Sequence, residues 1–103
     1  MKAITPHRKL LSIVCEACLE SRVAHDLGVL GASGYTVIDA RGQGAHGTRD
    51  GIWPPSANVR FEVICDVETA EMISAYLHDN YYQHYGMISY LSDVQVLRPE
   101  KFL

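Results

Sequence analysis

Residues 34–58 of this chain read GYTVIDARGQGAHGTRDGIWPPSAN. The run 35–40 is rich in β-branched and aromatic residues, which predicts a short strand. The segment 41–58 then contains four of the chain's eight glycines and two of its four prolines. Loops of this length in a small domain are usually functional or disordered. We therefore predict a strand that leads into a long functional loop.

The loop contains a possible nucleotide motif. Gly42, Gly44 and Gly47 have the G-x-G-x-x-G spacing of a dinucleotide-binding turn, which requires that a helix begin there. Pro54 and Pro55 break any helical pattern, so that assignment is excluded. Backbone N–H groups of glycines beside arginines are instead suited to hold an anion. The cationic or hydrogen-bonding groups of the loop are Arg41, His46 and Arg49. Its apolar tip is Trp53.

The composition limits the class of protein. With 103 residues the chain is long enough for one domain with a real core. Its net charge of −3 argues against nucleic-acid binding through a basic face. No window approaches the roughly 18 apolar residues of a membrane span, and residues 1–9 lack the apolar core of a signal peptide. Three cysteines, an odd number, fit a reducing compartment, so we expect a cytoplasmic protein.

The first part of the chain predicts a strand and a helix. Residues 10–15 form a nearly continuous apolar run, which is typical of a central strand. From Glu16 onward, leucines and a valine recur at intervals of four, four and three residues and mark one face of a helix. Gly31 is placed where a glycine commonly ends a helix. The strand at 35–40 follows.

The second half repeats this order of elements. Residues 58–65 alternate between apolar and polar side chains, which predicts a strand with one buried face. Asp66 is a good N-cap for a second helix, which ends before Gly86. A further apolar strand follows over 87–96, with a bulge at Ser92.

The order strand, helix, strand, strand, helix, strand folds most simply as a ferredoxin-like βαββαβ sandwich of the α+β class. One antiparallel sheet then has both helices on one face. The other face carries apolar side chains from Phe61, Val63 or Ile64, and we expect it to be buried against other subunits. No linker divides the chain, so residues 1–103 are predicted to form one domain.

An alternative interpretation rests on the cysteines. Cys15 and Cys18 form a C-x-x-C at a strand-to-helix junction, where a helix N-terminus can lower a thiol pKa. Cys65 ends a strand expected to lie parallel to the first and beside it, which would bring three sulfurs together as a soft-metal site. Buried cysteine is also a common core residue, and no fourth ligand is evident. A soft-metal-binding ferredoxin-like trimer therefore stays open as the alternative.

The remaining candidate groups are aromatic or catalytic. Tyr81, Tyr82 and Tyr85 either stack on a base or pack a helix end. The five histidines lack the spacing of a zinc site. No Ser-His-Asp or Cys-His order indicates covalent catalysis. We expect no enzymatic activity, with a slow nucleotidase as the rival interpretation.

Several segments resemble the PII and PII-like signalling proteins. The resemblance covers almost the whole chain and is most specific in GYTV at 34–37, RGQGAHG at 41–47, VRFEVI at 59–64, GMI at 86–88 and VQVLR at 94–98. It implies a ferredoxin-like homotrimer in which a long loop, the T-loop at about 41–58, projects between subunits. It also implies that adenine nucleotides bind in the clefts there.

The resemblance implies roles for individual residues. The implied nucleotide-binding set is Thr36, Arg41, Gly42, Gly44, Ile64, Gly86, Met87 and Arg98. Thr36 and Ile64 approach the adenine mainly through their backbone, whereas the arginines and glycines surround the phosphates. Met87 stands where nitrogen-sensing members carry a phosphate-binding lysine. Because that cation is missing, we expect ADP or AMP to be favoured over ATP.

The loop resembles the PII-like branch linked to inorganic carbon, whose members act beside bicarbonate transporters or carboxysomes. The T-loop has no tyrosine for uridylylation, and the paired C-terminal cysteines of that branch are missing. Nucleotide and bicarbonate are implied as regulatory ligands, not cofactors, which order the T-loop toward a transporter or carboxysome component. The residues expected at the bicarbonate are Arg41, Gly42 and Gln43. The residues expected at the partner are His46, Arg49 and Trp53.

Overall fold

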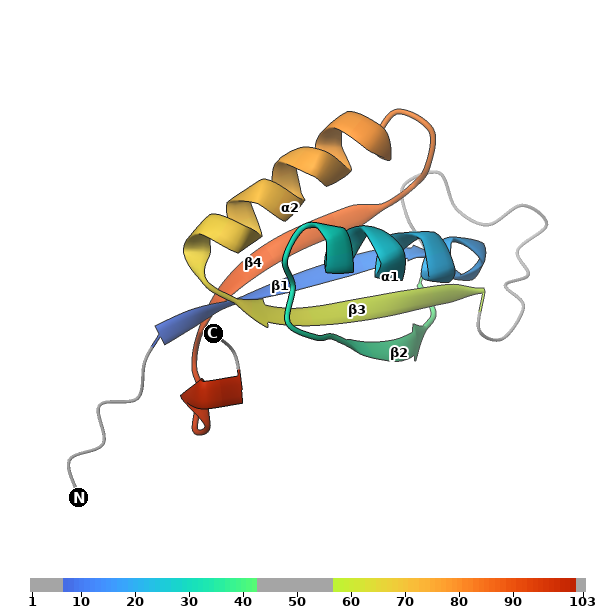
Figure 1. The fold of residues 1–103 in the computed structure, drawn as a ribbon. Helices are drawn as coiled ribbons and strands as arrows, with labels where there is room; N and C mark the ends of the chain where they lie inside the picture. Colours follow the sequence, from blue (N-terminus) through green and yellow to red (C-terminus); the bar gives the residue numbers. More distant parts are fainter. Residues whose placement is uncertain (1–6, 43–56, 102–103) are drawn as a thin grey trace, which may run out of the picture.

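The computed structural model describes residues 7–42 and 57–101 of the chain. These residues form four strands, two α-helices and two short 3-10 turns (Figure 1). In chain order the elements are β1 (His7–Glu16), η1 (Ala17–Leu19), α1 (Glu20–Val29), β2 (Thr36–Ala40), β3 (Asn58–Cys65), α2 (Val67–Asn80), β4 (Ile88–Gln95) and η3 (Pro99–Lys101).

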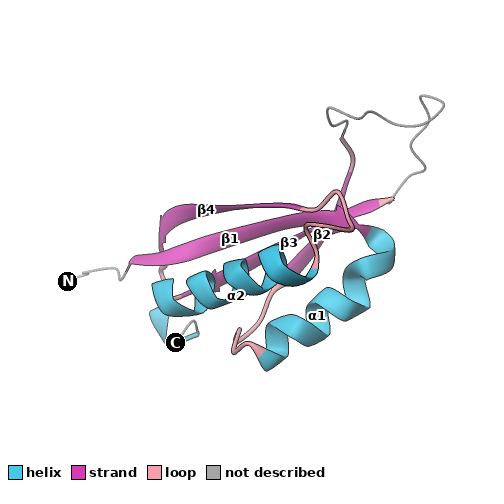
Figure 2. Cartoon of the chain, turned by 90° about the horizontal axis from the view of Figure 1, so that it is seen from above, coloured by secondary structure: helices cyan, strands magenta, loops and turns pink. Residues whose placement is uncertain are grey.

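The strands form one sheet in the order β2-β3-β1-β4, and every neighbouring pair is antiparallel. Both helices cover the same face of this sheet, as Figures 1 and 2 show from two directions. This is the ferredoxin-like βαββαβ arrangement, so the predicted fold class is confirmed. Neither described helix has the length and apolar composition needed to cross a membrane.

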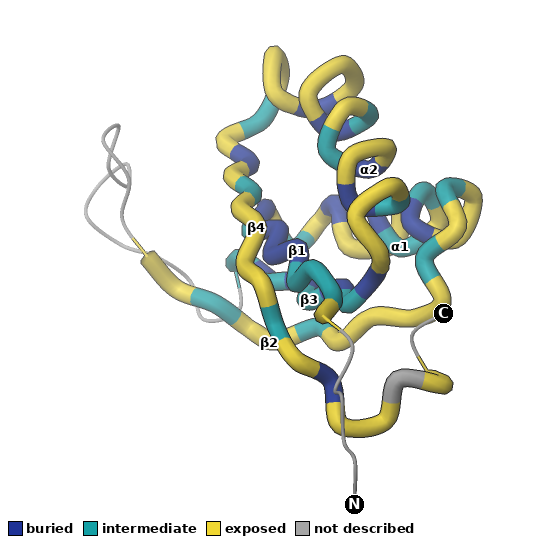
Figure 3. The backbone as a smooth tube through the Cα atoms, turned by 90° about the vertical axis from the view of Figure 1, so that its left-hand side faces the viewer, coloured by how far each residue is buried: buried dark blue, intermediate teal, exposed yellow. Residues whose placement is uncertain are grey.

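The core lies between the helices and the sheet, where Figure 3 shows most of the buried backbone positions. Successive side chains of a strand point to opposite faces, so only alternate residues of β1 and β3 enter it. Phe61 and Val63 are fully buried there, each worth roughly 2 kcal/mol relative to an exposed side chain. The prediction that they lie on the uncovered face was therefore wrong. Ile64 is on that other face, which we call the open face, directly opposite Leu10 of β1.

Local signals in the sequence fix the start of α2 and the end of α1. The Asp66 carboxylate accepts a hydrogen bond from the Thr69 backbone N–H at 2.8 Å, which confirms the predicted N-cap of α2. This hydrogen bond lowers the pKa of Asp66 below its ordinary value. Gly31 has φ of 98°, a left-handed conformation that ends α1 as predicted. The first helix begins at Glu20, after the 3-10 turn η1, and not at Glu16.

The pairing of β4 corrects one expectation. The register with β1 runs without interruption from His7 opposite Gln95 to Val14 opposite Ile88. No extra residue is inserted, so the predicted bulge at Ser92 was wrong. The polar residues near Ser92 need no bulge to be accommodated, because β4 is an edge strand and much of it is exposed.

Tyr81 connects the two helices. Its side chain is fully buried, its hydroxyl donates to the Asp26 carboxylate at 2.5 Å, and the Arg22 guanidinium lies 4.6 Å from its ring centre. Burial first, and the Asp26 contact second, raise the pKa of Tyr81. Tyr82 is partly exposed and its hydroxyl contacts that of Ser89. The structure thus favours helix-end packing for Tyr81 over stacking on a ligand.

Candidate functional site

A pocket of about 420 Å³ opens beside β2 and β3. We call it the β2–β3 pocket. It is lined by Ser33, Gly34, Tyr35, Thr36, Glu62, Ile64 and Lys101. Thr36 is paired directly with Glu62, and Ile64 lies two residues further along the same face of β3. The pocket therefore brings together Thr36 and Ile64, the two residues predicted to approach an adenine.

The pocket lies at the end of the sheet where β1 begins and β3 ends, which we call the pocket end. The strand β2 starts there, and the Tyr35 ring packs against Phe61 of the core with centroids 5.3 Å apart. The turn η3 is on the same side in Figure 1 and supplies Lys101 to the pocket. Arg98 precedes η3, and its exposed side chain is 3.5 Å from Glu100.

The pocket contains charges of both signs. Glu62 forms an ion pair with Arg60, with 3.2 Å between Arg60 Nη2 and Glu62 Oε2, and both side chains are partly exposed. Among the described lining residues, Lys101 is the one cation. Arg60 Nε is buried and has no hydrogen-bond partner in the described part of the chain.

The other predicted nucleotide residues lie at the opposite end of the sheet, which we call the loop end. Arg41 and Gly42 follow the last residue of β2, and Gly86 and Met87 precede the first residue of β4. Ala40 pairs with Asn58 and Asn58 with Glu16, so the ends of β2 and β1 lie on either side of the start of β3. Five extended residues separate Thr36 from Arg41, which is about 16 Å. One chain therefore does not bring all predicted residues together.

The glycines and Met87 of the loop end differ in what they can offer a ligand. A Cβ placed on Gly42 or Gly86 would meet no atom within 4 Å, so space surrounds both backbones. The Met87 side chain is buried in the core, with 6% of its surface exposed. Only its backbone is therefore available to a ligand. The predicted residues Gln43, Gly44, His46, Arg49 and Trp53 lie outside the described residues.

The structure contradicts the three-cysteine metal site. Because β1 and β3 are antiparallel and not parallel, Cys15 pairs with Val59 while Cys65 pairs with Lys9 at the other end. Six residues of strand, about 20 Å, separate the two positions. No group of three or more potential ligands that could hold a metal ion is found in residues 7–42 and 57–101. Burial raises the pKa of Cys15 to about 11, as expected of a core thiol.

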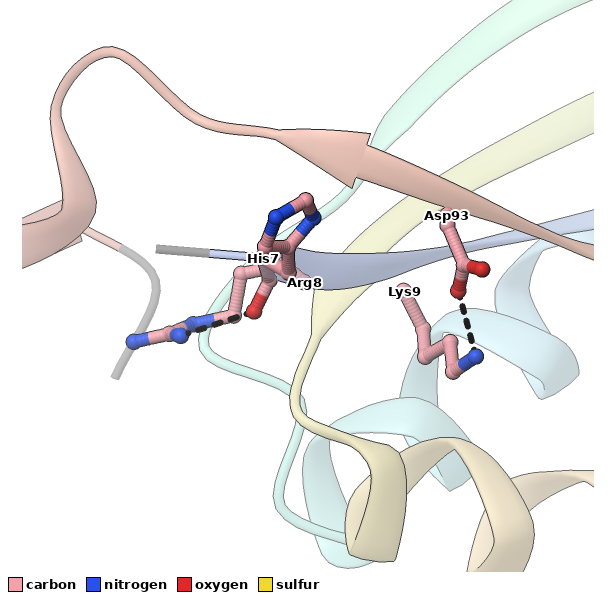
Figure 4. Close-up of polar contacts among 4 residues, drawn as sticks. All are labelled: His7, Arg8, Lys9 and Asp93. Carbon is pink, nitrogen blue, oxygen red and sulfur yellow. Dashed lines mark hydrogen bonds and ion pairs between the residues drawn. The ribbon is translucent and has the colours of Figure 1, made fainter. Parts of the chain in front are cut away.

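A second pocket, of about 380 Å³, lies where β1 begins and was not predicted. It is lined by His7, Arg8, Lys9, Asp66, Val67 and Asp93. Lys9 of β1 forms an ion pair with Asp93 of β4, which lowers the pKa of that carboxyl (Figure 4). Arg8 donates to the His7 carbonyl at 3.1 Å. With cations and acids together, this pocket shows no preference for one sign of ligand charge.

Sequence reasoning missed Glu62 and Lys101 as pocket residues. The alternation within 58–65 predicts only that Glu62 lies on the polar side of its strand, whereas its position opposite Thr36 depends on the register of β2 and β3. Lys101 reaches the pocket because the chain continues past β4 into the 3-10 turn η3. The alternation within 58–65 could have placed Glu62 and Ile64 on one face, whereas no local pattern places Lys101.

The strand order and the one-sided helical layer define a ferredoxin-like α+β domain, and a pocket of ligand size opens beside its sheet. The family model of the nitrogen regulatory protein P-II matches residues 8–101. The chain belongs to this family.

Solved structures agree with the family assignment. A PII-like signalling protein from Thermus thermophilus is 38% identical, with a TM-score of 0.80 over 94% of this chain and 96% of that one. CPII from Thiomonas intermedia, bound to ADP, AMP and bicarbonate, is 22% identical, with a TM-score of 0.81 over 94% of both chains. The same protein bound to ADP and bicarbonate gives 23% identity and a TM-score of 0.83 over 95% of this chain and 96% of that one.

Proposed function

We propose that this chain is a PII-like signalling protein that binds adenine nucleotides in clefts between the subunits of a homotrimer. The observation that carries the proposal is the separation of its predicted site residues. Thr36 and Ile64 line a pocket at one end of the sheet, whereas Arg41, Gly42 and Gly86 lie at the other. A neighbouring copy can supply the missing half, because a closed ring brings different surfaces of identical subunits together.

In this arrangement the two ends have different tasks. The pocket end of one subunit holds the adenine and ribose, beside the backbone of Thr36 and Ile64. The loop end of the neighbouring subunit holds the phosphates through Arg41 and the open backbones of Gly42 and Gly86. Arg98, with its exposed side chain, neutralises the phosphates from the pocket end.

The open face of the sheet provides the surface for assembly. It is not covered by either helix, and it carries Ile88 and Tyr90, which are 57% and 47% exposed. Val14 and Ile64 lie half-buried on the same face. An exposed apolar surface of this kind is typical of a protein–protein interface. We assign it to contacts between subunits.

The ligand preference follows from charge. Because Met87 replaces a phosphate-binding lysine and its side chain is buried, the loop end lacks that cation for a third phosphate. ADP or AMP is therefore preferred over ATP. The proposed role is regulatory and not catalytic, and the proposed location is the cytoplasm.

Bicarbonate is the second proposed ligand, at Arg41, Gly42 and Gln43. Support comes from the fold shared with CPII, whose structures contain ADP, AMP and bicarbonate. Ligand binding would order the T-loop, which then controls a partner in inorganic carbon uptake or fixation, such as a bicarbonate transporter or a carboxysome component. A ligand shifts such a loop only through its different affinity for the two loop states.

Calorimetric titration tests the proposal directly. ADP, AMP, cyclic AMP and ATP are each titrated with and without bicarbonate, and the tightest ligand is repeated with Arg98→Ala. Micromolar ADP or AMP binding that bicarbonate tightens and Arg98→Ala weakens supports the whole proposal. If bicarbonate does not change the nucleotide affinity, the proposed link to inorganic carbon is wrong. If the trimer binds no nucleotide, the proposed function is wrong.

A further inference from the structure

The turn between α2 and β4, residues 81–87, contains Gly86, whose open backbone is assigned above to the phosphates. Both ends of this turn are anchored in the core, because the side chains of Tyr81 and Met87 are buried. The residues 82–84 between them are exposed. Gly86 has no side chain that could fix its own backbone. The conformation of this backbone therefore depends on contacts made by neighbouring residues.

Backbone hydrogen bonds close the turn on Tyr81. The Tyr81 carbonyl accepts the N–H of His84 at 3.0 Å and the N–H of Tyr85 at 3.1 Å. The rings of Tyr81 and Tyr85 also pack together, with centroids 6.0 Å apart. Tyr85 directly precedes Gly86 in the chain. The position of the Gly86 backbone therefore depends on how firmly the two tyrosines are held.

Two charged residues of α1 hold these tyrosines. The Asp26 carboxylate accepts a hydrogen bond from the Tyr81 hydroxyl at 2.5 Å. Arg22 Cζ lies 4.6 Å from the centre of the Tyr81 ring, and Arg22 Nη1 is 3.5 Å from the Tyr85 hydroxyl oxygen. Arg22 and Asp26 are four residues apart, which places them on one face of the helix. Figure 1 shows the start of α1 and the turn after α2 on the same side of the molecule.

These contacts matter for anion binding because they restrict the turn before a ligand arrives. A guanidinium over an aromatic ring is attracted to the face of the ring, so Arg22 and Tyr81 limit each other's movement. A mobile backbone loses conformational entropy when it is ordered around a ligand, and this loss weakens binding. A turn that is already fixed avoids most of that loss.

We propose that Arg22 and Asp26 are positioning residues for phosphate binding, which hold Tyr81 and Tyr85 and so keep the Gly86 backbone in its binding conformation. The inference rests on the proposed function and deepens it, because neither residue of α1 belongs to the set expected to contact the nucleotide. It makes phosphate binding sensitive to changes in α1. The nucleoside, which is bound at the pocket end of another subunit, is not affected by such changes.

The test uses the full chain in its native assembly and measures two properties. Calorimetric titration gives the affinities for ADP and for adenosine, and hydrogen exchange of the ligand-free protein gives the protection of the backbone at 82–88. Arg22→Ala should weaken ADP binding about threefold to tenfold, because the turn has to be ordered on binding. The same variant should leave adenosine affinity unchanged and should speed exchange at 82–88.

The second position gives a conservative variant. Asp26→Ala should also weaken ADP binding and leave adenosine affinity unchanged. Asp26→Asn should restore most of the ADP affinity, since its amide oxygen can still accept a hydrogen bond from the Tyr81 hydroxyl. His25→Ala removes an exposed side chain of the same helix and is the matched control, which should change neither affinity nor exchange.

Four outcomes overturn the inference. If Arg22→Ala leaves ADP affinity unchanged, α1 has no part in phosphate binding, while the proposed function stands. If it weakens ADP binding without faster exchange at 82–88, Arg22 contacts the phosphates directly. Equal losses for ADP and adenosine would mean that Arg22 supports the whole assembly. If the wild-type trimer binds no adenine nucleotide, the proposed function fails, and the positioning role fails with it.

Discussion

The two ends of the sheet differ in how much of a binding site each provides. The pocket end has a cavity with defined walls, including Thr36, Glu62 and Ile64. The loop end offers Arg41 and the open backbones of Gly42 and Gly86. The first suits a nucleoside and the second suits phosphates. Because Thr36 and Arg41 lie about 16 Å apart along β2, the proposed nucleotide site combines the pocket end of one subunit with the loop end of another.

The largest expected effect comes from separating the subunits. Ile88→Asp places a charge on the open face, at a side chain that is 57% exposed in the single chain. The chain should still fold, but the apolar contact between subunits should be lost. ADP affinity should then fall at least about a hundredfold, because each chain keeps only half of the site. Analytical ultracentrifugation and calorimetry check this. Tight ADP binding by a folded monomer would contradict it.

Removing a charge at the loop end should have the next largest effect. Arg41→Ala deletes a cation proposed to bind phosphate, and ADP affinity should fall about tenfold to a hundredfold. Adenosine has no phosphates, so its affinity should stay the same. Titration of both ligands measures the difference. Equal losses for ADP and adenosine would mean that Arg41 supports the fold and not the phosphates.

Tyr81→Phe tests the packing that supports the loop end. The substitution removes the hydrogen bond to Asp26 and leaves that half-buried carboxylate without it, which should cost about 1–2 kcal/mol of unfolding free energy. The Tyr81 carbonyl also accepts a hydrogen bond from the backbone N–H of Tyr85, the residue before Gly86, at 3.1 Å. The substitution keeps this backbone hydrogen bond. Urea unfolding checks the loss of stability. An unchanged unfolding free energy would show that the Tyr81–Asp26 contact is not stabilising.

The smallest effect is expected at the N-cap of α2, near the pocket end. Asp66→Ala should lower the melting temperature at neutral pH, because the Thr69 N–H loses its acceptor. The folded-state pKa of Asp66 is lowered from 3.8, so its contribution is complete above that pH and is lost as the pH falls through the folded value. Thermal unfolding from pH 7 to pH 2 should show the two proteins converging. A constant difference would contradict the role of the charge.

Local signals in the sequence were sufficient for the elements. The alternation of 58–65 gave the bounds of β3, Asp66 was recognised as a cap, and Gly31 was recognised as the end of α1. These features depend on neighbouring residues alone. The fold class followed because the order of elements permits few topologies.

Features that depend on strand direction or register were harder to predict. The parallel placement of the strands that contain Cys15 and Cys65 was wrong. The crossover through α1 keeps β2 in the same direction as β1, and the chain reverses between β2 and β3, so β1 and β3 are antiparallel. Glu62 and Lys101 were missed for a related reason. The position of Glu62 in the pocket depends on its pairing with Thr36, and the position of Lys101 depends on the path of the chain after β4.

Complementation between two damaged chains tests the central claim most directly. Arg41→Ala damages only the loop end and Arg98→Ala only the pocket end, so each homotrimer should bind ADP weakly. Mixed trimers formed by co-expressing the two chains should regain roughly one intact site each, where the unaltered ends meet. Recovery of wild-type affinity at about a third of the sites is the predicted result. Uniformly weak binding in mixed trimers would place Arg41 and Arg98 in the same chain's site and contradict the account.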